Sequence, residues 1–402
     1  MSSKNIVIVT TNFANGGTER RASVLANEFV KKGYTVTYLV INKIFPDVVY
    51  KLDDKITLVG ISDFMESHIS KKEKQQAEKW KNKKLKYLSK IHSIAKLFGI
   101  NDITVKRQRN ILAKSEYIRA FALCNPGAIY ICFGIDVYER VCNAVKGLNC
   151  KIVFSDINAP QADGENVDER SFKILRKADA CVFQTFDQKD CYSGYLPDNS
   201  VIIRNPITSQ LPEMFDGERK SKIVNFCRIA SQKNLILLAD AFKLFLADYP
   251  DYVLEIYGIT STESARAYKE KLLKHIEDLG IQDRMFIYNA VSDIHQKICD
   301  SKIYVSSSDY EGLSNSMIEA MAMGLPCVCT DCLGGGAREM IKDGENGLLV
   351  PVKDADAMYR AMCRMVQEEG LAQRCSENAY KVRTELSVEN IVNQWINAIE
   401  SL

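Results

Sequence analysis

Short apolar runs alternate with amphipathic segments along most of this 402-residue chain. Apolar runs of about four to eight residues between polar turns are typical of buried strands, and apolar positions that recur every three or four residues indicate helices. In the first half of the chain, strands are predicted at residues 6–10, 34–41, 128–133, 151–155, 180–184 and 201–204. In the second half, strands are predicted at residues 223–226, 254–257, 285–288, 303–305 and 326–330.

Helices are predicted between and after these strands, at residues 18–32, 235–249, 315–323, 356–369 and 387–401. Two of them are followed by a glycine, Gly33 and Gly324, as is common where a helix ends in a left-handed residue. Strands that alternate with helices predict an α/β fold with parallel sheets, in which ligands bind at the carboxyl ends of the strands. The chain length favours two domains, and the turn at Asn205-Pro206 is the predicted boundary.

The most polar turns of the predicted second domain lie between residues 303 and 350. Glu311 is in the loop after one strand and Glu319 is in the following helix, with seven residues between them. Backbone amides at the start of that helix, near Ser314, make an anion site that suits a phosphate, and acids beside it can accept hydrogen bonds from sugar hydroxyls. For an isolated pair of acids, the ordinary interpretation is that Glu319 caps the helix with Ser316.

Two other loops carry candidate ligand groups. Arg228 and Lys233 frame a loop at the end of a strand, where their charges suit a diphosphate, although two basic residues in a loop are more often ordinary surface residues. Gly16 and Gly17 precede the first helix, where a tight turn is the ordinary interpretation. Their loop is not G-x-G-x-x-G, so a dinucleotide-binding fold is poorly supported.

The composition indicates the environment of the protein rather than any reaction that it catalyses. Hydrophobic residues make up 46% of the chain and the formal net charge is +2, which allows substantial cores and indicates no general attraction to acidic partners. The 13 cysteines show no disulfide or metal-binding spacing, and neither a signal peptide nor an apolar run of membrane-helix length is present, so a cytoplasmic, reduced protein is predicted. Asp354 and Asp356 form an Asp-x-Asp pair before a helix, where capping is the ordinary role, and no metal site is predicted.

Residues 70–114 depart most from this neutral balance, with 12 Lys and 2 Arg against 3 acidic residues, a local net charge of +11. Apolar positions recur there at helical spacing around Trp80 and Tyr87, which predicts one or two amphipathic helices with a basic face. Such a face is either a solvated surface or a contact for anionic lipid or a lipid-diphosphate acceptor at the inner side of a membrane. No nucleic-acid-binding motif accompanies the charge, and nucleic acid is not a predicted partner.

As a whole, residues 311–326, EGLSNSMIEAMAMGLP, resemble the Glu-x7-Glu signature of the family 4 retaining glycosyltransferases. The segments GGAREMI and DGENGLLVP that follow also resemble this family. The resemblance implies a GT-B fold, with two Rossmann-like domains whose parallel sheets face an interdomain cleft. It further implies an acceptor-side domain at 1–205, a donor-binding domain at 206–384, and a last helix at 385–402 that crosses back onto the first domain.

The same resemblance implies roles for individual residues. Glu311 is the predicted catalytic residue, which binds sugar hydroxyls and supports charge at the reacting carbon, and Glu319 is predicted to bind the ribose. The predicted donor-binding residues are Arg228 and Lys233 at the diphosphate, Gly312, Leu313, Ser314 and Asn315 at the start of the helix, Gly16 and Gly17 near the phosphates, and Asn289 and Ala290 beside the nucleobase.

Two segments depart from the family pattern. Cys227 stands where a glycine usually precedes the basic loop. Asp156 and Ile157 lie where many relatives carry a histidine near the acceptor, which puts the acceptor side of the site in doubt. Asp156 is either a polar contact for the acceptor or a cap at the end of a strand.

The resemblance implies a retaining hexosyltransferase that needs no cofactor and transfers a sugar from a nucleotide-diphosphate donor, with UDP favoured over GDP. The predicted acceptor is a glycan or a lipid-linked molecule, and the predicted process is surface-polysaccharide or glycoconjugate biosynthesis. The alternative is a nucleotide-sugar epimerase of GT-B architecture, which would need placed acid and base groups that the sequence does not offer. A third interpretation is a catalytically silent subunit that binds sugar nucleotides.

Overall fold

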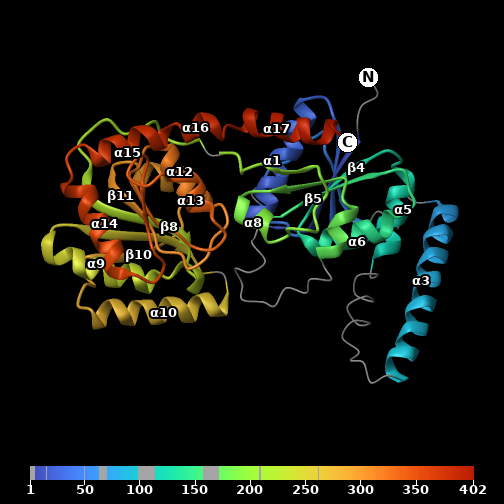
Figure 1. Cartoon of the computed structure of the whole chain (residues 1–402), viewed down its shortest axis with the longest axis horizontal. Helices are drawn as coiled ribbons and strands as arrows, with labels where there is room; N and C mark the ends of the chain where they lie inside the picture. Colours follow the sequence, from blue (N-terminus) through green and yellow to red (C-terminus); the bar gives the residue numbers. More distant parts are fainter. Residues whose placement is uncertain are drawn as a thin grey trace.

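The computed structural model describes residues 5–14, 16–48, 50–62, 70–97, 114–156, 172–207, 210–260 and 262–402, with the backbone alone for 87–97. Two α/β units lie side by side along the long axis of the molecule (Figure 1). Each unit is built on a parallel sheet, which confirms the α/β fold predicted from the alternation of strands and helices.

In the described part of the first unit, seven parallel strands have the order β3-β2-β1-β4-β5-β6-β7. These strands are β1 (Asn5–Phe13), β2 (Thr35–Ile44), β3 (Thr57–Gly60), β4 (Ile129–Phe133), β5 (Lys151–Ser155), β6 (Ala180–Phe183) and β7 (Ser200–Ile202). The helices are α1 (Gly17–Lys31), α3 (Lys71–Leu97), α5 (Ser115–Cys124), α6 (Ile135–Val145), the 3-10 helix η1 (Lys173–Lys177) and α8 (Phe186–Asp190). Side chains of β1 alternate between two cores, because Ile6 and Ile8 face α1 whereas Val7 and Val9 face α5 and α6.

The second unit has six described parallel strands in the order β10-β9-β8-β11-β12-β13. They are β8 (Lys220–Arg228), β9 (Val253–Ile259), β10 (Met285–Asn289), β11 (Ser301–Ser306), β12 (Cys327–Thr330) and β13 (Leu348–Val350). The helices are the 3-10 helix η2 (Ser231–Lys233), α9 (Leu235–Asp248), α10 (Glu263–Asp278), α11 (Ile294–Ile298), α12 (Asn315–Ala322), α13 (Gly336–Met340), α14 (Ala355–Gln367), α15 (Leu371–Tyr380) and α16 (Val382–Glu385). The α12 bounds confirm the helix predicted at 315–323.

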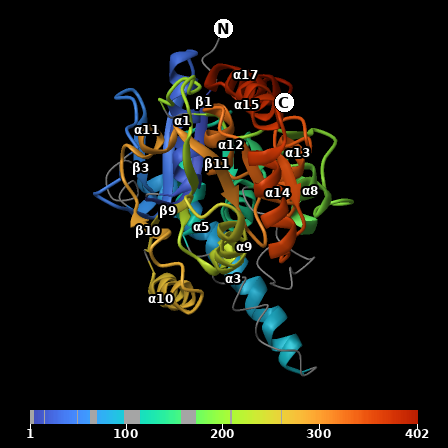
Figure 2. The same ribbon diagram turned by 90° about the vertical axis from the view of Figure 1, so that its left-hand side faces the viewer.

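The last helix, α17 (Val388–Glu400), follows α16 but lies over the first unit beside α1 (Figures 1 and 2). Its Trp395 is completely buried, and the guanidinium of Arg21 in α1 lies 5.4 Å from the centre of the Trp395 ring. At the C-terminal end of the helix, Glu400 accepts a hydrogen bond from the Tyr34 hydroxyl at 2.8 Å. The final segment therefore ties the end of the chain to the first unit.

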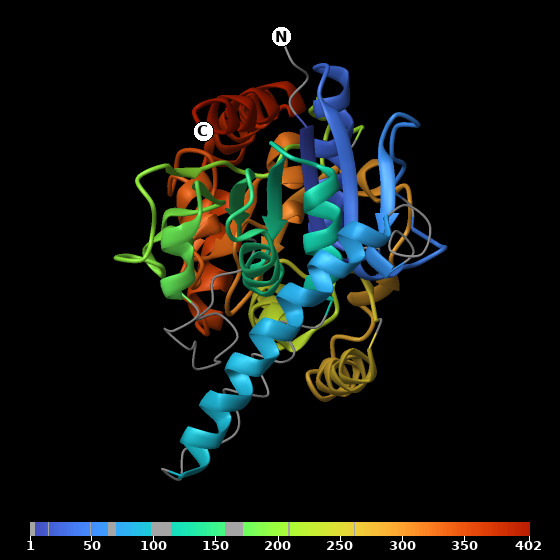
Figure 3. The same cartoon turned by 90° about the vertical axis from the view of Figure 1, so that its right-hand side faces the viewer.

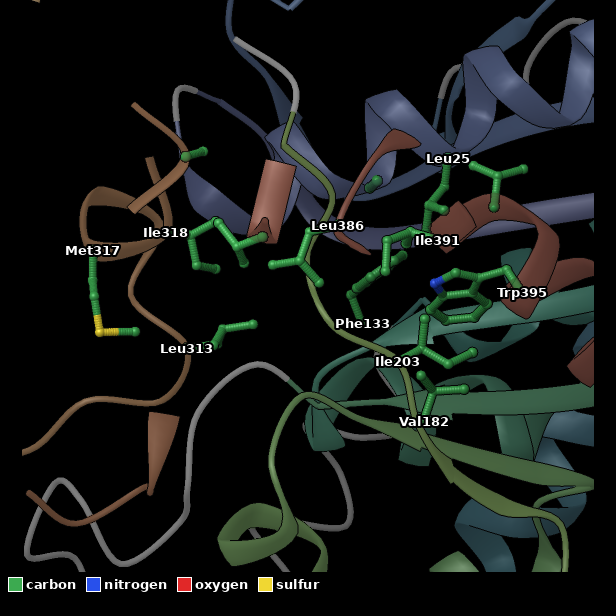
Figure 4. Close-up of a cluster of buried hydrophobic side chains, with 14 of the residues drawn as sticks. Leu25, Phe133, Val182, Ile203, Leu313, Met317, Ile318, Leu386, Ile391 and Trp395 are labelled. Carbon is green, nitrogen blue, oxygen red and sulfur yellow. The ribbon is translucent and has the colours of Figure 1, made fainter. Parts of the chain in front are cut away.

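One apolar cluster continues from the first unit into the second. Figure 4 shows Ile391 and Trp395 of α17 next to Leu25 of α1, with Leu386 between them and Ile318 of α12. Because dispersion and burial act over this whole cluster, it stabilises the relative placement of the two units. We propose residues 1–205, 206–384 and 385–402 as the first domain, the second domain and the crossing helix, and use these terms below.

None of the helices in the described ranges combines the length and the apolar character of a membrane-spanning segment.

Candidate active site

Two loops that are far apart in the sequence meet where the domains face each other. A Cβ atom on Gly17, at the start of α1, would lie 3.8 Å from Nδ2 of Asn315, at the start of α12. Asn205, next to the predicted domain boundary, donates a hydrogen bond to Oδ1 of the same Asn315 at 3.1 Å. The Gly-Gly loop of the first domain therefore lies opposite the helix start that is predicted to bind phosphate; Asn15 of that loop is outside the described residues.

The start of α12 is capped by Ser314, whose hydroxyl accepts the backbone N–H of Met317 at 3.4 Å. This corrects the alternative that Glu319 caps the helix with Ser316, because the cap is Ser314 and Glu319 has other partners. Leu313, just before the cap, is buried in the interdomain apolar cluster. Its backbone, and not its side chain, is therefore the part that can bind the donor. With the first-turn amides directed out of the helix, this end of α12 favours an anion.

Glu311 and Lys233 form an ion pair, in which Nζ of Lys233 donates to Oε2 of Glu311. The Lys233 and Glu311 side chains are 11% and 22% exposed, so the pair lies at the floor of the site with one side open. Ser308 also contacts the same carboxylate oxygen, at 3.5 Å. The structure thus brings together the predicted catalytic acid and one of the two predicted diphosphate ligands.

The Glu311 loop is held from behind by the glycine loop that follows β12. The Glu311 backbone N–H donates to the Leu333 carbonyl at 2.9 Å. A Cβ atom on Gly334 would lie 2.3 Å from the Glu311 carbonyl oxygen, and one on Gly336 would lie 2.0 Å from that of Gly312. Only glycine allows the two backbones to approach this closely, so the loop geometry depends on both positions.

Arg228 lies at the end of β8, on the exposed side of the same cluster. Its guanidinium donates to Oε1 of Gln232 at 3.2 Å, and the Gln232 amide donates to the Tyr310 carbonyl at 2.9 Å. Gln232 therefore connects Arg228 to the Glu311 loop. Sequence reasoning did not single out Gln232, although it lies between the two basic residues that were singled out.

Glu319 is directed toward the first domain and is almost completely buried. Its Oε1 accepts a hydrogen bond from the Arg20 guanidinium at 2.8 Å, and its Oε2 lies 2.9 Å from Nε2 of His295. Burial raises the pKa of Glu319, but the hydrogen bond from His295 and the charge of Arg20 together outweigh it, so this pKa lies below its ordinary value. Arg20 and His295 were missed in the sequence; only the position of Arg20, directly after Gly16-Gly17-Thr18-Glu19, offered a signal.

Asn289 and Ala290 lie at the end of β10, away from Glu311. The Ala290 N–H donates to the Gly258 carbonyl at 3.0 Å, and Tyr288 stacks on Tyr257 with their ring centres 5.0 Å apart. A Cβ atom on Gly258 would lie 2.4 Å from the Cys227 carbonyl oxygen, so the chain needs glycine here, next to the residue that departs from the family pattern. Burial raises the pKa of the Cys227 thiol to about 12, which keeps it neutral.

Asp156, at the end of β5, is buried and accepts a hydrogen bond from the Tyr192 hydroxyl. The Arg21 guanidinium donates to the Asp156 carbonyl at 3.4 Å and to that of Ile203 at 3.2 Å. Burial lowers the pKa of Arg21, and the charge of Asp156 opposes that shift. Asp156 therefore has internal partners in the first domain, whereas Ile157 lies outside the described residues.

The Asp-x-Asp pair and the cysteines near β12 have structural surroundings. Asp354 accepts the N–H of Ala357 at 2.7 Å and caps α14, which confirms the ordinary interpretation of the pair. Cys327, Cys329 and Cys332 are buried free thiols on and after β12. In the described ranges, no three His, Cys, Asp or Glu side chains are grouped closely enough to hold a metal ion.

Comparisons with known proteins identify relatives of the chain. Residues 212–382 match the family of glycosyl transferases group 1. The chain is 25% identical to an uncharacterized glycosyltransferase of Haemophilus influenzae, over 94% of this chain and 95% of that protein. It is 27% identical to the poly(glycerol-phosphate) alpha-glucosyltransferase of Bacillus subtilis, over 58% of this chain and 34% of that enzyme, so it spans about a third of the Bacillus protein.

Solved structures support the fold over the whole chain. A mutant of TarM from S. aureus, crystallised in complex with fondaparinux, alpha-GlcNAc-glycerol and UDP, superposes with a TM-score of 0.71 at 16% identity, over 98% of this chain and 99% of TarM. At that identity the similarity establishes the fold alone. The chain thus has the GT-B fold, and its second domain matches the glycosyl transferases group 1 family, which supports a glycosyltransferase.

Proposed function

We propose that the chain is a retaining glycosyltransferase that transfers a hexose from a nucleotide-diphosphate sugar to a glycan or lipid-linked acceptor. The observation that carries this proposal is the Lys233–Glu311 pair, at the carboxyl edge of the second sheet and next to the start of α12. The process is surface-polysaccharide or glycoconjugate biosynthesis, and the poly(glycerol-phosphate) substrate in the name of the Bacillus relative supports that assignment. UDP is the proposed nucleotide, supported by the UDP in the TarM crystal.

The charges of the site suit the departure of a diphosphate. As the bond between the sugar C1 and the diphosphate oxygen breaks, negative charge develops on the leaving group. Arg228, Lys233 and the amides at the start of α12 would stabilise that charge, and groups positioned in advance for a developing charge give most of the rate gain in such sites. Lys233 would move from Glu311 to the phosphate when the donor enters, which would release the carboxylate for the sugar hydroxyls.

The acceptor hydroxyl would attack C1 from the same face that the diphosphate leaves. The new bond joins the acceptor oxygen to C1, and the hydroxyl proton passes to an oxygen of the leaving phosphate. Glu311 would bind the sugar hydroxyls and support positive charge at C1, and Glu319 would bind the ribose. Configuration at C1 is then retained without a covalent intermediate.

A thermal-shift panel of UDP-, GDP- and ADP-sugars tests the donor assignment. A ligand at 100 times its dissociation constant stabilises the protein by about 2.7 kcal/mol. UDP-sugars should therefore raise the melting temperature most, and a Lys233→Ala variant should lose the shift. No shift with any sugar nucleotide would contradict the proposal.

We also propose that α3 attaches the protein to an anionic membrane surface where a lipid-linked acceptor resides. Ala77 is buried against α5, the Trp80 ring lies 5.3 Å from the Arg119 guanidinium, and Lys81 pairs with Glu116 at 2.5 Å. These contacts hold one side of the helix, while its far end projects from the body of the first domain (Figure 3).

The opposite side of α3 carries an exposed row of lysines. At about 100° per residue, Lys72, Lys79, Lys83 and Lys86 fall within a sector of about 60°. Each lysine near an anionic surface contributes about 1 kcal/mol, and the attraction falls off within a Debye length. Four of them support reversible, salt-sensitive attachment without a spanning helix.

Co-sedimentation with vesicles that contain phosphatidylglycerol tests this attachment. The parent protein should sediment at low salt and be released at high salt, and should ignore vesicles of phosphatidylcholine alone. A variant with these four lysines changed to Gln should stay in the supernatant. The control is a variant of the second domain in which four lysines are changed to Gln: Lys243, Lys269, Lys271 and Lys274. It has the same net charge as the α3 variant and should sediment like the parent. If both variants sediment equally, the row of lysines on α3 is only a solvated surface.

A further inference from the structure

An ion pair joins the two domains at Glu319, the proposed ribose ligand. Arg20 belongs to the first turn of α1, and its guanidinium lies 2.8 Å from Oε1 of Glu319 in α12. The Glu319 side chain is only 9% exposed, and a buried carboxylate is strongly destabilising without a partner. The contact with Arg20 therefore matters both for the domain interface and for the state of the donor site.

The start of α1 is held firmly enough to fix Arg20. The next residue, Arg21, is buried, donates to the carbonyls of Asp156 and Ile203, and has its guanidinium 5.4 Å from the Trp395 ring centre. Because Arg21 connects α1 to β5 and to α17, the backbone that carries Arg20 has little freedom. In the arrangement of the structure, Arg20 of this fixed part of the first domain reaches Glu319 of the second domain.

The other oxygen of Glu319 is held from within the second domain. Nε2 of His295 lies 2.9 Å from Oε2, and the His295 ring packs edge-on against Phe226 with ring centres 5.9 Å apart. One residue of each domain thus fixes the carboxylate.

We propose that Arg20 is a positioning residue of the donor site, which orients Glu319 across the domain boundary and so couples domain closure to nucleotide binding. This inference rests on the proposed function, because it takes Glu319 as the ribose ligand. The coupling is reciprocal: closure favours the nucleotide, and the nucleotide favours closure. Without Arg20, Glu319 keeps His295 but loses the partner that forms only when the domains close.

Titration calorimetry with UDP, and kinetics with a UDP-sugar, test the role of Arg20. Arg20→Ala should weaken UDP binding about tenfold or more, the effect of one lost charge-assisted hydrogen bond, and should raise the donor KM more than it lowers kcat. Arg20→Lys should recover part of the affinity. Arg204→Ala is the matched control, because Arg204 pairs with Glu339 across the same boundary at 3.2 Å without touching Glu319, and it should lose less UDP affinity.

Two further measurements separate this role from a general loosening of the interface. In a Glu319→Gln background, Arg20→Ala should cause little additional loss of UDP affinity, since both changes remove the same interaction. Small-angle scattering should show UDP-dependent compaction of the wild type that is reduced in Arg20→Ala.

The outcomes distinguish the two proposals. Wild-type protein that fails to bind UDP would contradict the proposed function and, with it, this inference. Wild-type protein that binds UDP, with unchanged or tighter binding by Arg20→Ala, would overturn the inference alone, because Arg20 would then be idle or compete with the ribose. Losses that simply add in the double variant would also overturn it.

Discussion

Lys72, Lys79 and Lys83 of α3 lie on the exposed side of that helix, whereas the charged groups around Glu311 and Glu319 point at one another. Lys72, Lys79 and Lys83 are exposed, and salt screens such charges. Lys233 and Glu311 are mostly buried and paired, so removal of one leaves the other without its partner. A local excess of charge therefore indicates a surface for a polyanion, while opposite charges that converge at strand ends indicate a site for a specific ligand.

Neutralising Glu311, the acid at the centre of the converging charges, should have the largest effect. Glu311→Gln should lower kcat by about a hundredfold or more, the usual effect of losing one group that stabilises a transition state. Its affinity for UDP should change little, because the proposed partner of Glu311 is the sugar. Kinetics with a UDP-sugar and calorimetry with UDP measure the two quantities.

Asp331→Asn is a suitable control for Glu311→Gln. Asp331 lies on the neighbouring loop and pairs with Arg338 at 2.6 Å. A loss of turnover in Asp331→Asn as large as that in Glu311→Gln would show that the loop, not the carboxylate of Glu311, carries the effect.

Removal of both basic groups should have the next largest effect. Each charge-assisted hydrogen bond is worth about 1.5–3 kcal/mol, so Arg228→Ala with Lys233→Ala should weaken UDP binding by about a hundredfold or more. Uridine lacks the diphosphate and should bind almost as well as to the parent. Calorimetry with UDP and with uridine measures the two changes in affinity. Equal losses of affinity for UDP and uridine would show that Arg228 and Lys233 do not contact the phosphates.

The stability contributed by Glu319 should depend on pH in a definite direction. Its folded pKa lies below the ordinary value of 4.5, so its stabilisation is complete above that pH and is lost as the pH falls through the folded pKa. At neutral pH, Glu319→Gln should lower the free energy of unfolding by about 1–3 kcal/mol. The difference in the free energy of unfolding between the parent and Glu319→Gln should become smaller in acid.

Urea unfolding at a series of pH values measures this gap. Glu345→Gln is the control, because Glu345 and Lys342 form an exposed pair at 4.0 Å that should contribute almost nothing at any pH. A gap for Glu319→Gln that stays constant into acid would mean that the charge of Glu319 is not what stabilises the protein.

The four-lysine variant of α3 should show the smallest effect on folding. Substitution of an exposed charged side chain usually changes stability little, and even an exposed ion pair contributes only about 0–1 kcal/mol. Its urea midpoint should therefore match that of the parent even where vesicle binding is lost. A large drop in the midpoint would mean that the row of lysines supports the fold and would remove the contrast between the two regions.

Local patterns were enough to predict the helix at the candidate site. The spacing of apolar residues and the glycine after the helix, Gly324, located α12, whereas the close backbone approach of the glycine loop after β12 was not predicted. Partners of Glu319 were not predictable, because Arg20 is 299 and His295 is 24 residues away in the chain. Such contacts follow from the folding of whole domains, and no local pattern encodes them.

Elements with weak apolar signals were missed for a different reason. In α10 the buried residues are Ala265, Leu272 and Ile276, which is too sparse a pattern to stand out among its charged neighbours. The strand β13 has three residues, fewer than the about four that an apolar run needs to indicate a strand. Both elements pack against larger neighbouring elements, and their own sequences do not predict this burial.

Proton NMR of the reaction product shows whether the protein transfers the sugar with retention of the anomeric configuration. The protein is incubated with an α-linked UDP-sugar and a glycan or lipid-linked acceptor, and the anomeric coupling of the new linkage is measured. We expect an α-linked product, with release of UDP that depends on the acceptor and is lost in Glu311→Gln. A β-linked product would contradict retention, and an epimerised UDP-sugar formed without acceptor would show that the site performs a different reaction.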